Sequence, residues 1–260
     1  MTLYACHLTL HDNIFFATRE MGILYETEKY LHNWAISYAF FKGSYIPHPY
    51  GLQGDTAQKP DYLDPSREQN LLHLNEAGLY VFPAKPLSWS YQINTFKAAQ
   101  TTYYGKSKQF GVKGADRNYP INYGRAKELA VGSHYQTFLM TPDNSEIQFP
   151  RWIRLGKWAA KVMVHLQLIP EAAIQKKSGK YVCDHPLNPL DLPLEQDLEL
   201  YNRIVMPPSS LVSQAQLNGE YWQLRGDEWN ALRQQLPNLP KTLCLPVGVS
   251  YGAKTLTAVS

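Results

Sequence analysis

The start of the chain alternates between apolar and polar positions. Across residues 3–10, the even positions lie on one side of an extended chain and carry the more apolar side chains, Tyr4, Cys6, Leu8 and Leu10. This period of two predicts a β-strand whose buried face is formed by the even positions. A second alternation after the segment RWIRLGKW predicts another strand with one buried face, formed by Val162, Val164, Leu166 and Leu168.

A longer spacing follows the first strand. From Met21 to Phe41, apolar residues recur three or four positions apart, or at multiples of these spacings, and Gly43 follows them. That pattern predicts a long amphipathic helix that ends before Gly43. Near the other end of the chain, DEWNALRQQL predicts a short helix that Asp227 caps.

Further segments predict strands and loops. GLYVFPAKPLSWSYQINTF indicates two β segments interrupted by prolines, while HYQTFLM and KTLCLPVGV indicate one strand each. SLVSQAQLNGEYWQLRG predicts a hairpin, because Asn218-Gly219 is the dipeptide that a tight type I′ turn prefers. Residues 42–70, rich in Pro, predict a loop. Residues 184–199, acidic and without Lys or Arg, predict a solvated loop or a short helix. We therefore expect one α+β domain over residues 1–260, built mainly on antiparallel sheet.

The composition is that of a folded protein, with 44% hydrophobic and 18% charged residues. The three cysteines, Cys6, Cys183 and Cys244, are far apart and lack metal-binding spacing, which predicts reduced thiols in the cytoplasm. No segment has the pattern of a leader peptide or the roughly 18 apolar residues of a membrane span. We expect a cytoplasmic protein with no membrane partner.

Positive charge is concentrated in the middle of the chain. The whole protein has a net charge of only +3, but residues 97–161 contain eleven Lys or Arg and four acidic residues. That stretch carries +7, which leaves −4 for the remainder. Such an asymmetry is typical of a protein that presents one surface to a polyanion.

The segment KSKQFGVKGADRNYPINYGRAK, from Lys106 to Lys127, interleaves cations with aromatic rings and glycines. Cations bind phosphates and flat rings stack on unpaired bases, so this pattern favours single-stranded nucleic acid over a packing role. The alternative is a solvated loop with a few aromatics folded onto the core. Together with the cations of RWIRLGKW, the predicted RNA-binding residues are Lys106, Lys108, Phe110, Lys113, Arg117, Tyr119, Tyr123, Arg125, Lys127, Arg151, Arg154 and Lys157.

RWIRLGKW is a compact version of the same pattern. In an extended chain Arg151, Ile153, Leu155 and Lys157 share one side, and Trp152, Arg154 and Trp158 share the other. We expect Trp158 to belong to the core. Arg154 and Lys157, beside Gly156, are the better candidates for phosphate contacts.

Motifs for other chemistry are missing from the sequence. There is no G-x-S-x-G motif of a hydrolase and no glycine motif of a mononucleotide site. The eight histidines include no H-x-x-x-H pair on a predicted helix and no His paired with Cys at ligand spacing, so we expect no metal and no cofactor. His7 is interpreted as structural and His165 as facing solvent or a partner, although either could act as an acid or base in RNA cleavage.

Four blocks resemble a known family. LTLHDNIFFATREMG with YETEKYLHNWAISYAF, then LYVFPAKPL, and later RWIRLGKWAAKVMVHL resemble the Cas-five-type RAMP subunits, also called Csc-one, of type I-D CRISPR interference (Cascade) complexes. The resemblance covers essentially the whole chain. It implies a ferredoxin-like, RRM-like RAMP core with an extended β-hairpin thumb, which we place at about 100–133.

The resemblance also implies a function. Such a subunit caps the 5′ handle of the crRNA, contacts the large subunit and the backbone subunits, and lies near the PAM of the double-stranded target DNA. It implies binding without catalysis. Two alternatives stay open: a metal-independent endoribonuclease that cuts precursor crRNA, with His7, His11 and Tyr4 as possible participants, and a structural adaptor that touches only protein.

Overall fold

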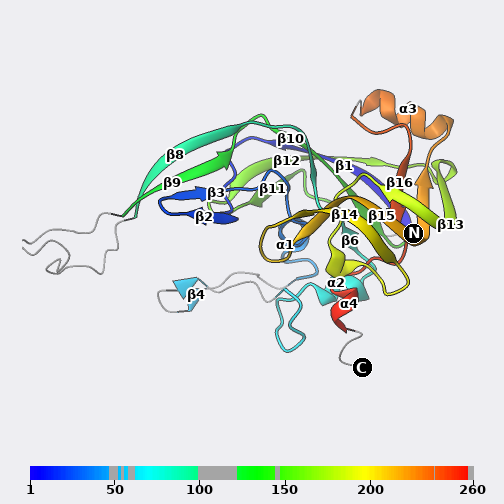
Figure 1. The fold of residues 1–260 in the computed structure, drawn as a ribbon, viewed down its shortest axis with the longest axis horizontal. Helices are drawn as coiled ribbons and strands as arrows, with labels where there is room; N and C mark the ends of the chain where they lie inside the picture. The colour runs from blue at the N-terminus through cyan, green and yellow to red at the C-terminus, as the bar shows by residue number, and fades with distance from the viewer. Residues whose placement is uncertain are drawn as a thin grey trace, which may run out of the picture.

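Antiparallel sheet dominates the fold and the helices are few (Figure 1). The structure is a computed structural model, and it describes residues 1–46, 52–53, 56–57, 62–98, 122–143, 147–236 and 238–256. This arrangement confirms the prediction of a mainly antiparallel α+β chain. The ferredoxin-like detail stays a prediction.

The main sheet holds the centre of the molecule. Among the described residues it has six strands in the order β11–β12–β1–β10–β6, with β7 also paired to β10. β1 pairs antiparallel with both β10 and β12. The strands are β1 (Thr2–Leu10), β6 (Tyr80–Val81), β7 (Lys85–Ser88), β10 (His134–Thr141), β11 (Trp152–Leu155) and β12 (Ala160–Leu168).

The alternation in β1 predicts its burial only in part. Cys6, Leu8 and Leu10 on the even face are buried, as expected, but Leu3 and Ala5 on the odd face are buried as well. Ala5 lies opposite Phe138 of β10, whose ring is 4.9 Å from the buried His185. The first half of β1 is therefore covered on both faces, and only the second half has an open face.

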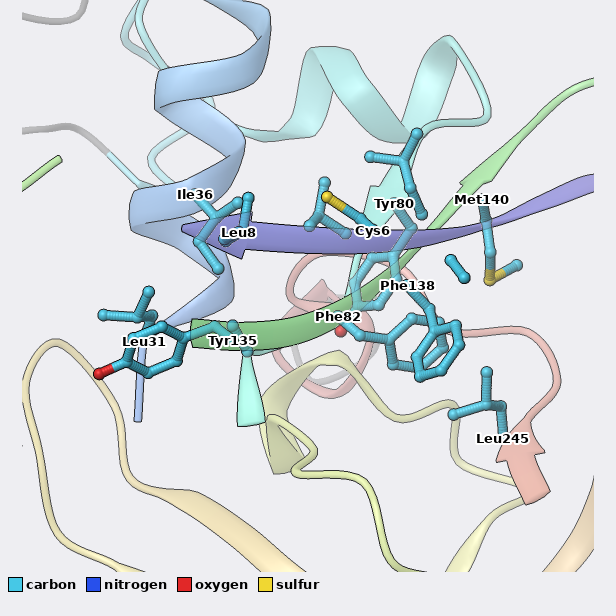
Figure 2. Close-up of a cluster of buried hydrophobic side chains, with 14 of the residues drawn as sticks. Cys6, Leu8, Leu31, Ile36, Tyr80, Phe82, Tyr135, Phe138, Met140 and Leu245 are labelled. Atoms are coloured by element: carbon cyan, nitrogen blue, oxygen red, sulfur yellow. The ribbon is translucent and has the colours of Figure 1, made fainter. Parts of the chain in front are cut away.

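Helix α1 (Asn33–Phe41) covers the even face of β1 (Figure 2). The surrounding core includes Ile36, Leu8, Tyr135, Phe138, Tyr80 and Phe82. Ile36 and Leu8 lie between α1 and β1, whereas Phe138 lies on the odd face, opposite Ala5. The other side of α1 is also enclosed, because Tyr38 donates a hydrogen bond to the Gln69 carbonyl and Trp34 packs against Tyr62. Burial on all sides explains why the helix is apolar around its whole circumference.

The predicted helix over Met21 to Phe41 was wrong in its first half. Residues 19–26 form two short antiparallel strands instead, β2 (Arg19–Met21) and β3 (Leu24–Glu26), and Leu31 makes an isolated bridge to Ala84. The helix begins after His32, whose Nδ1 accepts a hydrogen bond from the backbone N–H of Trp34. Apolar spacing over the hairpin imitated a helical period, and pairing with the rest of the sheet overrode it.

The arm sheet consists of β2 and β3 with β8 (Tyr91–Ala98) and β9 (Asn122–Leu129), in the order β2–β3–β9–β8. It projects from one end of the main sheet (Figure 1). β8 and β9 pair antiparallel from Tyr91 opposite Leu129 to Ala98 opposite Asn122. Residues 99–121 between them lie outside the described residues, so the thumb stays a prediction.

The second sheet contains β13 (Ile174–Cys183), β14 (Asp197–Ile204), β15 (Leu211–Leu224) and β16 (Leu243–Pro246). The hairpin predicted at Asn218-Gly219 was wrong, because β15 runs through both residues as one strand. Gly219 lies opposite Gly179, and a Cβ at Gly219 would stand 2.7 Å from Oε1 of Gln196. Close approach of a neighbouring side chain, and not a turn, requires this glycine.

The acidic segment 184–199 is not a solvated loop. It contains the 3₁₀ turn η3 (Pro189–Asp191), and the Asp191 carboxylate is fully enclosed. That carboxylate accepts hydrogen bonds from Asn33 Nδ2 at 2.7 Å, Tyr80 Oη at 3.1 Å, Trp34 Nε1 at 3.2 Å and the Gly252 N–H at 2.9 Å. Asp191 thus joins α1, β6 and the C-terminal turn, which acidity alone did not predict.

The remaining elements are short. The helix predicted at DEWNALRQQL is confirmed as α3 (Asp227–Gln235), but its N-cap is Gly226 and not Asp227. None of the described helices has the length and apolarity needed to cross a membrane. The other elements are α2 (Leu72–Glu76), α4 (Ala253–Leu256), the 3₁₀ turn η2 (Glu171–Ala173), and the paired strands β4 (Leu52–Gln53) and β5 (Thr56–Ala57).

Candidate nucleic-acid interface

The predicted RNA-binding residues divide into three groups. Lys106, Lys108, Phe110, Lys113, Arg117 and Tyr119 lie outside the described residues, and of Tyr123 only the place in β9 is described. Arg125 and Lys127 belong to β9 in the arm sheet. Arg151, Arg154 and Lys157 lie in or beside the β11–β12 hairpin at the edge of the main sheet.

The two predicted RNA-binding cations of β9, Arg125 and Lys127, differ in their surroundings. Arg125 is exposed opposite Thr95 and Leu24. Lys127 Nζ is 2.9 Å from Oε1 of Glu26 and 4.5 Å from the ring centroid of Tyr91. Lys127 therefore links β9 to β3, whereas Arg125 is exposed and available to a ligand.

The turn between β11 and β12 fastens the main sheet to the base of the arm. Gly156 has a φ of +78°, and a Cβ there would stand 2.8 Å from the Phe15 carbonyl oxygen. The Lys157 N–H donates to that carbonyl at 2.7 Å, while the Lys157 side chain is exposed. Glycine is required by this backbone conformation and by the close contact.

Trp158 in the same turn was expected in the core, and this prediction was wrong. Its side chain is 50% exposed. One part of the indole packs on Phe15, with ring centroids 4.6 Å apart, and another lies 6.2 Å from Phe96 of β8. Phe96 in turn lies over Gly124, where a Cβ would stand 2.2 Å from the ring. Trp158 thus joins the two sheets and still presents an aromatic surface to solvent.

The odd face of the main sheet contains residues that the sequence did not identify. Lys161 of β12 lies across from Arg154, and its Nζ stands 4.0 Å from the ring centroid of Trp152. The His11 ring meets the same indole edge-on at 4.9 Å. Trp152 is 42% exposed. Strand pairing brings Lys161, Trp152 and His11 together. The sequence of one strand does not reveal the register of that pairing.

Arg154 is held beside this group. Its Nη1 donates to the Ala159 carbonyl at 3.1 Å and lies 3.7 Å from Oδ2 of Asp12. Asp12 also accepts the backbone N–H of Lys161 at 2.8 Å. These two contacts fix the orientation of the Arg154 side chain. Its ion pair with Asp12 is exposed to solvent and therefore contributes little to stability.

The main sheet has an uneven charge distribution. Its six described strands contain no Asp or Glu, although they contain Lys85, Arg154, Lys161 and three histidines. The cations of β11 and β12 lie at one edge, and the Trp158 contact with Phe96 brings that edge beside the arm sheet. A face with cations, a half-exposed indole and no carboxylate on its strands suits phosphate and stacked bases.

Comparisons with known proteins identify the family. Residues 1–254 match the model of the family described as type I-D CRISPR-associated protein Cas5/Csc1. This chain belongs to that family. A search of curated proteins returned no match.

Two solved structures resemble this Cas5/Csc1 family member distantly. The first is a cryo-EM structure of the type III-B Cmr-beta complex bound to cognate target RNA and AMPPnP, with 8% identity over 91% of this chain and 90% of that one and a TM-score of 0.41. The second is a CRISPR protein from Archaeoglobus fulgidus, with 9% identity over 85% of this chain and 95% of that one and a TM-score of 0.32.

The residues considered for RNA cleavage lie on two faces of the main sheet, because His7 and His165 are opposite each other on the odd face and Tyr4 lies on the even face. Tyr4 lies on the opposite face of β1 from His7 and His11, and its ring packs edge-on against Phe149 at 5.6 Å. No group of three or more potential metal ligands occurs among the described residues. The arrangement that the structure does assemble is a set of cations and rings on one sheet face.

Proposed function

We propose that this Cas5/Csc1 family member is a non-catalytic RNA-binding subunit of a type I-D effector complex. It caps the 5′ handle of the crRNA, contacts the large subunit and the backbone subunits, and helps to dock PAM-bearing double-stranded DNA. One observation carries the proposal. A sheet face with Trp152 and Lys161, whose described strands carry no Asp or Glu, adjoins the arm that carries Arg125, in a chain that matches the family over residues 1–254.

The proposed binding mode divides the work between rings and cations. Trp152 and Trp158 offer exposed aromatic surface for unpaired bases, each worth about 1–3 kcal/mol if a base stacks. Arg151, Arg154, Lys157 and Arg125 contact phosphates. Residues 106–119 extend this strip as the predicted thumb. Recognition of target sequence is left to base pairing by the guide.

A handle-binding experiment tests the proposal. The purified protein is titrated with a fluorescent repeat-derived 5′ handle RNA and with a scrambled RNA of equal length, both in EDTA. We expect tighter binding of the handle and intact RNA afterwards. Equal affinity for the two RNAs would contradict handle recognition, and discrete products at a fixed position would replace the binding assignment with an endoribonuclease.

A charge-reversal pair tests the predicted thumb against the adaptor alternative. Lys106, Lys108 and Arg117 are changed together to Glu, and the matched control changes Lys176, Lys177 and Lys180 of β13 to Glu. The thumb variant should bind the handle more weakly, with a log–log salt slope that is shallower by about 0.7 for each single-strand phosphate that the variant no longer neutralises. Unchanged RNA affinity in the thumb variant would favour an adaptor that touches only protein.

A further inference from the structure

Three histidines lie together on the open part of the main sheet. His7 of β1 is directly opposite His165 of β12 in the strand register. Its ring stacks on His134 of β10, with centroids 5.2 Å apart and planes 6° from parallel. His165 is exposed, and His7 and His134 are half-buried. Three neighbouring strands thus supply one imidazole each to the same face.

The charged and titratable groups around this triplet are mostly basic. On β12, Lys161 precedes His165 on the same face, and His11 follows His7 just beyond the end of β1. Beyond β12, β11 supplies Arg154, whose partner Asp12 is the nearest carboxylate that we identify on this side. On β10, Gln136 lies opposite His7, and on β7 Lys85 lies opposite Gln136. No strand that packs against His7 carries a carboxylate.

This environment opposes protonation of the free protein. The pKa of His7 lies below its ordinary value, first because the ring is partly removed from water and then because His134 and His165 would repel its charge. Adjacent imidazolium ions without an anion between them repel each other. An anion bound across the three rings would remove that repulsion, since protonated imidazoles donate from both nitrogens.

We propose that His7, His134 and His165 form a phosphodiester-binding site for single-stranded nucleic acid, and that protonation strengthens this site. The inference rests on the proposed RNA-binding function. Nucleic acid is favoured over an acidic protein segment because an exposed indole lies next to the histidines on the same face. Trp152 of β11 pairs with Met163, two residues before His165 on β12, and Lys161 Nζ lies over its ring. A base can stack where a phosphate is already held by imidazolium groups.

The sign of the pH dependence follows from linkage. Bound phosphate raises the pKa of each imidazole that contacts it, so the added affinity is present below the pKa of the free protein. It is lost as pH rises through the pKa of the complex. Two other histidines, His32 and His185, do not supply this effect, because burial lowers the pKa of each to about 3.

The experiment uses a 12-nucleotide oligouridylate, because uracil does not titrate between pH 5.5 and 7.5. Its affinity is measured at constant ionic strength across that range for wild type, for His165→Gln and for the double variant His7→Gln/His165→Gln. His73→Gln on α2 is the matched control, since His73 lies outside the main sheet and beside Glu76. Asp191 titrates in the same window, but every variant retains it.

We expect wild type and His73→Gln to bind at least about tenfold more tightly at pH 5.5 than at pH 7.5, as one or more coupled protons allow. His165→Gln should lose part of this gain and the double variant most of it, with less than about threefold remaining. The fold of each variant is checked by circular dichroism at both pH values. If the double variant does not fold, the exposed single variant His165→Gln decides.

Three results would overturn the inference. The first is a double variant with the wild-type pH response, or, if only His165→Gln folds, an unchanged response in that variant. The second is no oligouridylate binding at pH 5.5 by a protein that binds the handle. The third is equal, equally pH-dependent binding of oligoglutamate, which would assign the site to an acidic protein partner. Loss of handle selectivity at pH 7.5 with an intact histidine-dependent response would instead reject only the proposed handle function.

Discussion

Lysines on the main sheet and on the second sheet differ in their partners. On the second sheet, Lys176 lies 2.8 Å from Glu220 and Lys180 lies 2.8 Å from Glu199. On the main sheet, Lys161 lies over an indole, and no strand offers it a carboxylate. Charges that are neutralised within the chain contribute to its own surface, whereas charges without a partner are free to bind an external anion. The contrast between Lys161 and the paired Lys176 and Lys180 favours the main sheet as the proposed binding surface and the second sheet as scaffold.

The largest effect is expected where α1, β6 and the C-terminal turn depend on one buried group, the Asp191 carboxylate. Asp191→Ala removes the acceptor for Asn33, Tyr80, Trp34 and the Gly252 N–H, all of which stay buried. Leaving buried hydrogen-bonding groups unpaired should lower the free energy of unfolding by about 3–5 kcal/mol. Urea denaturation followed by circular dichroism measures the free energy of unfolding. A loss below about 1 kcal/mol would show that the Asp191 carboxylate does not hold these elements together.

Asp191→Asn tests how the same buried carboxylate makes the free energy of unfolding depend on pH. Burial raises the pKa of Asp191 to about 6, so the folded state holds the proton more tightly than the unfolded chain. Stability from this group is then greatest below the unfolded pKa of about 4 and declines as pH rises towards about 6. Relative to Asp191→Asn, wild type should lose about 2 kcal/mol of unfolding free energy between pH 4 and pH 7, because part of the total loss already occurs below pH 4. A flat difference across this range would contradict the assignment.

Two aromatic residues with similar exposure compare the sheets directly. Trp152 on the main sheet is 42% exposed and Tyr201 on the second sheet is 44% exposed. Trp152→Ala should weaken handle RNA binding by about 1–3 kcal/mol, or about 5- to 150-fold, through lost base stacking. Tyr201→Ala should leave the affinity unchanged in the same fluorescence titration. Equal effects would remove the distinction between scaffold and binding surface.

The parts of the fold that sequence predicted are those with local signals. The strands β1 and β12 and the helix DEWNALRQQL were confirmed as elements because period and composition agree within one segment. Their alternation predicted burial only in part, since Leu3 and Ala5 on the odd face of β1 are buried and Leu168, expected on the buried face of β12, is 56% exposed. Asn218-Gly219 misled because a glycine required by the approach of Gln196 has the same sequence signature as a turn. Acidity at Asp191 suggested solvent, since burial by four donors from distant segments leaves no local trace.

The candidate site shows the same division. Arg151, Arg154 and Lys157 were identified from their interleaving with tryptophans, and the structure places all three side chains at an exposed edge. Lys161 and the histidine triplet were missed as a group because they come together only through strand register. Lys127 was included because its positive charge is visible in sequence, whereas its partner Glu26 lies far away along the chain.

A single cation on each sheet gives a smaller and more specific contrast. Lys161→Glu should reduce RNA affinity by about tenfold at low salt and make the log–log salt slope shallower by about 0.7, as expected when one single-strand phosphate is no longer neutralised. Lys180→Glu makes the same change of charge on the second sheet and should alter the slope by much less. Titrations at several salt concentrations measure both. Equal changes would mean that overall charge, and not the open face, determines binding.

The smallest effect concerns the ion pairs that define the second sheet as scaffold. A double-mutant cycle on Lys176 and Glu220, with each residue changed to Ala, isolates their coupling from other contributions. Both side chains are about half exposed, so water screens the 2.8 Å pair, and we expect about 0.2–1 kcal/mol. The same cycle on Arg154 and Asp12, 3.7 Å apart on the binding side, should give still less in the free protein. If the Arg154 pair were the more strongly coupled of the two, this cation would be bound to its own chain and Lys161 would have to carry the phosphate contact.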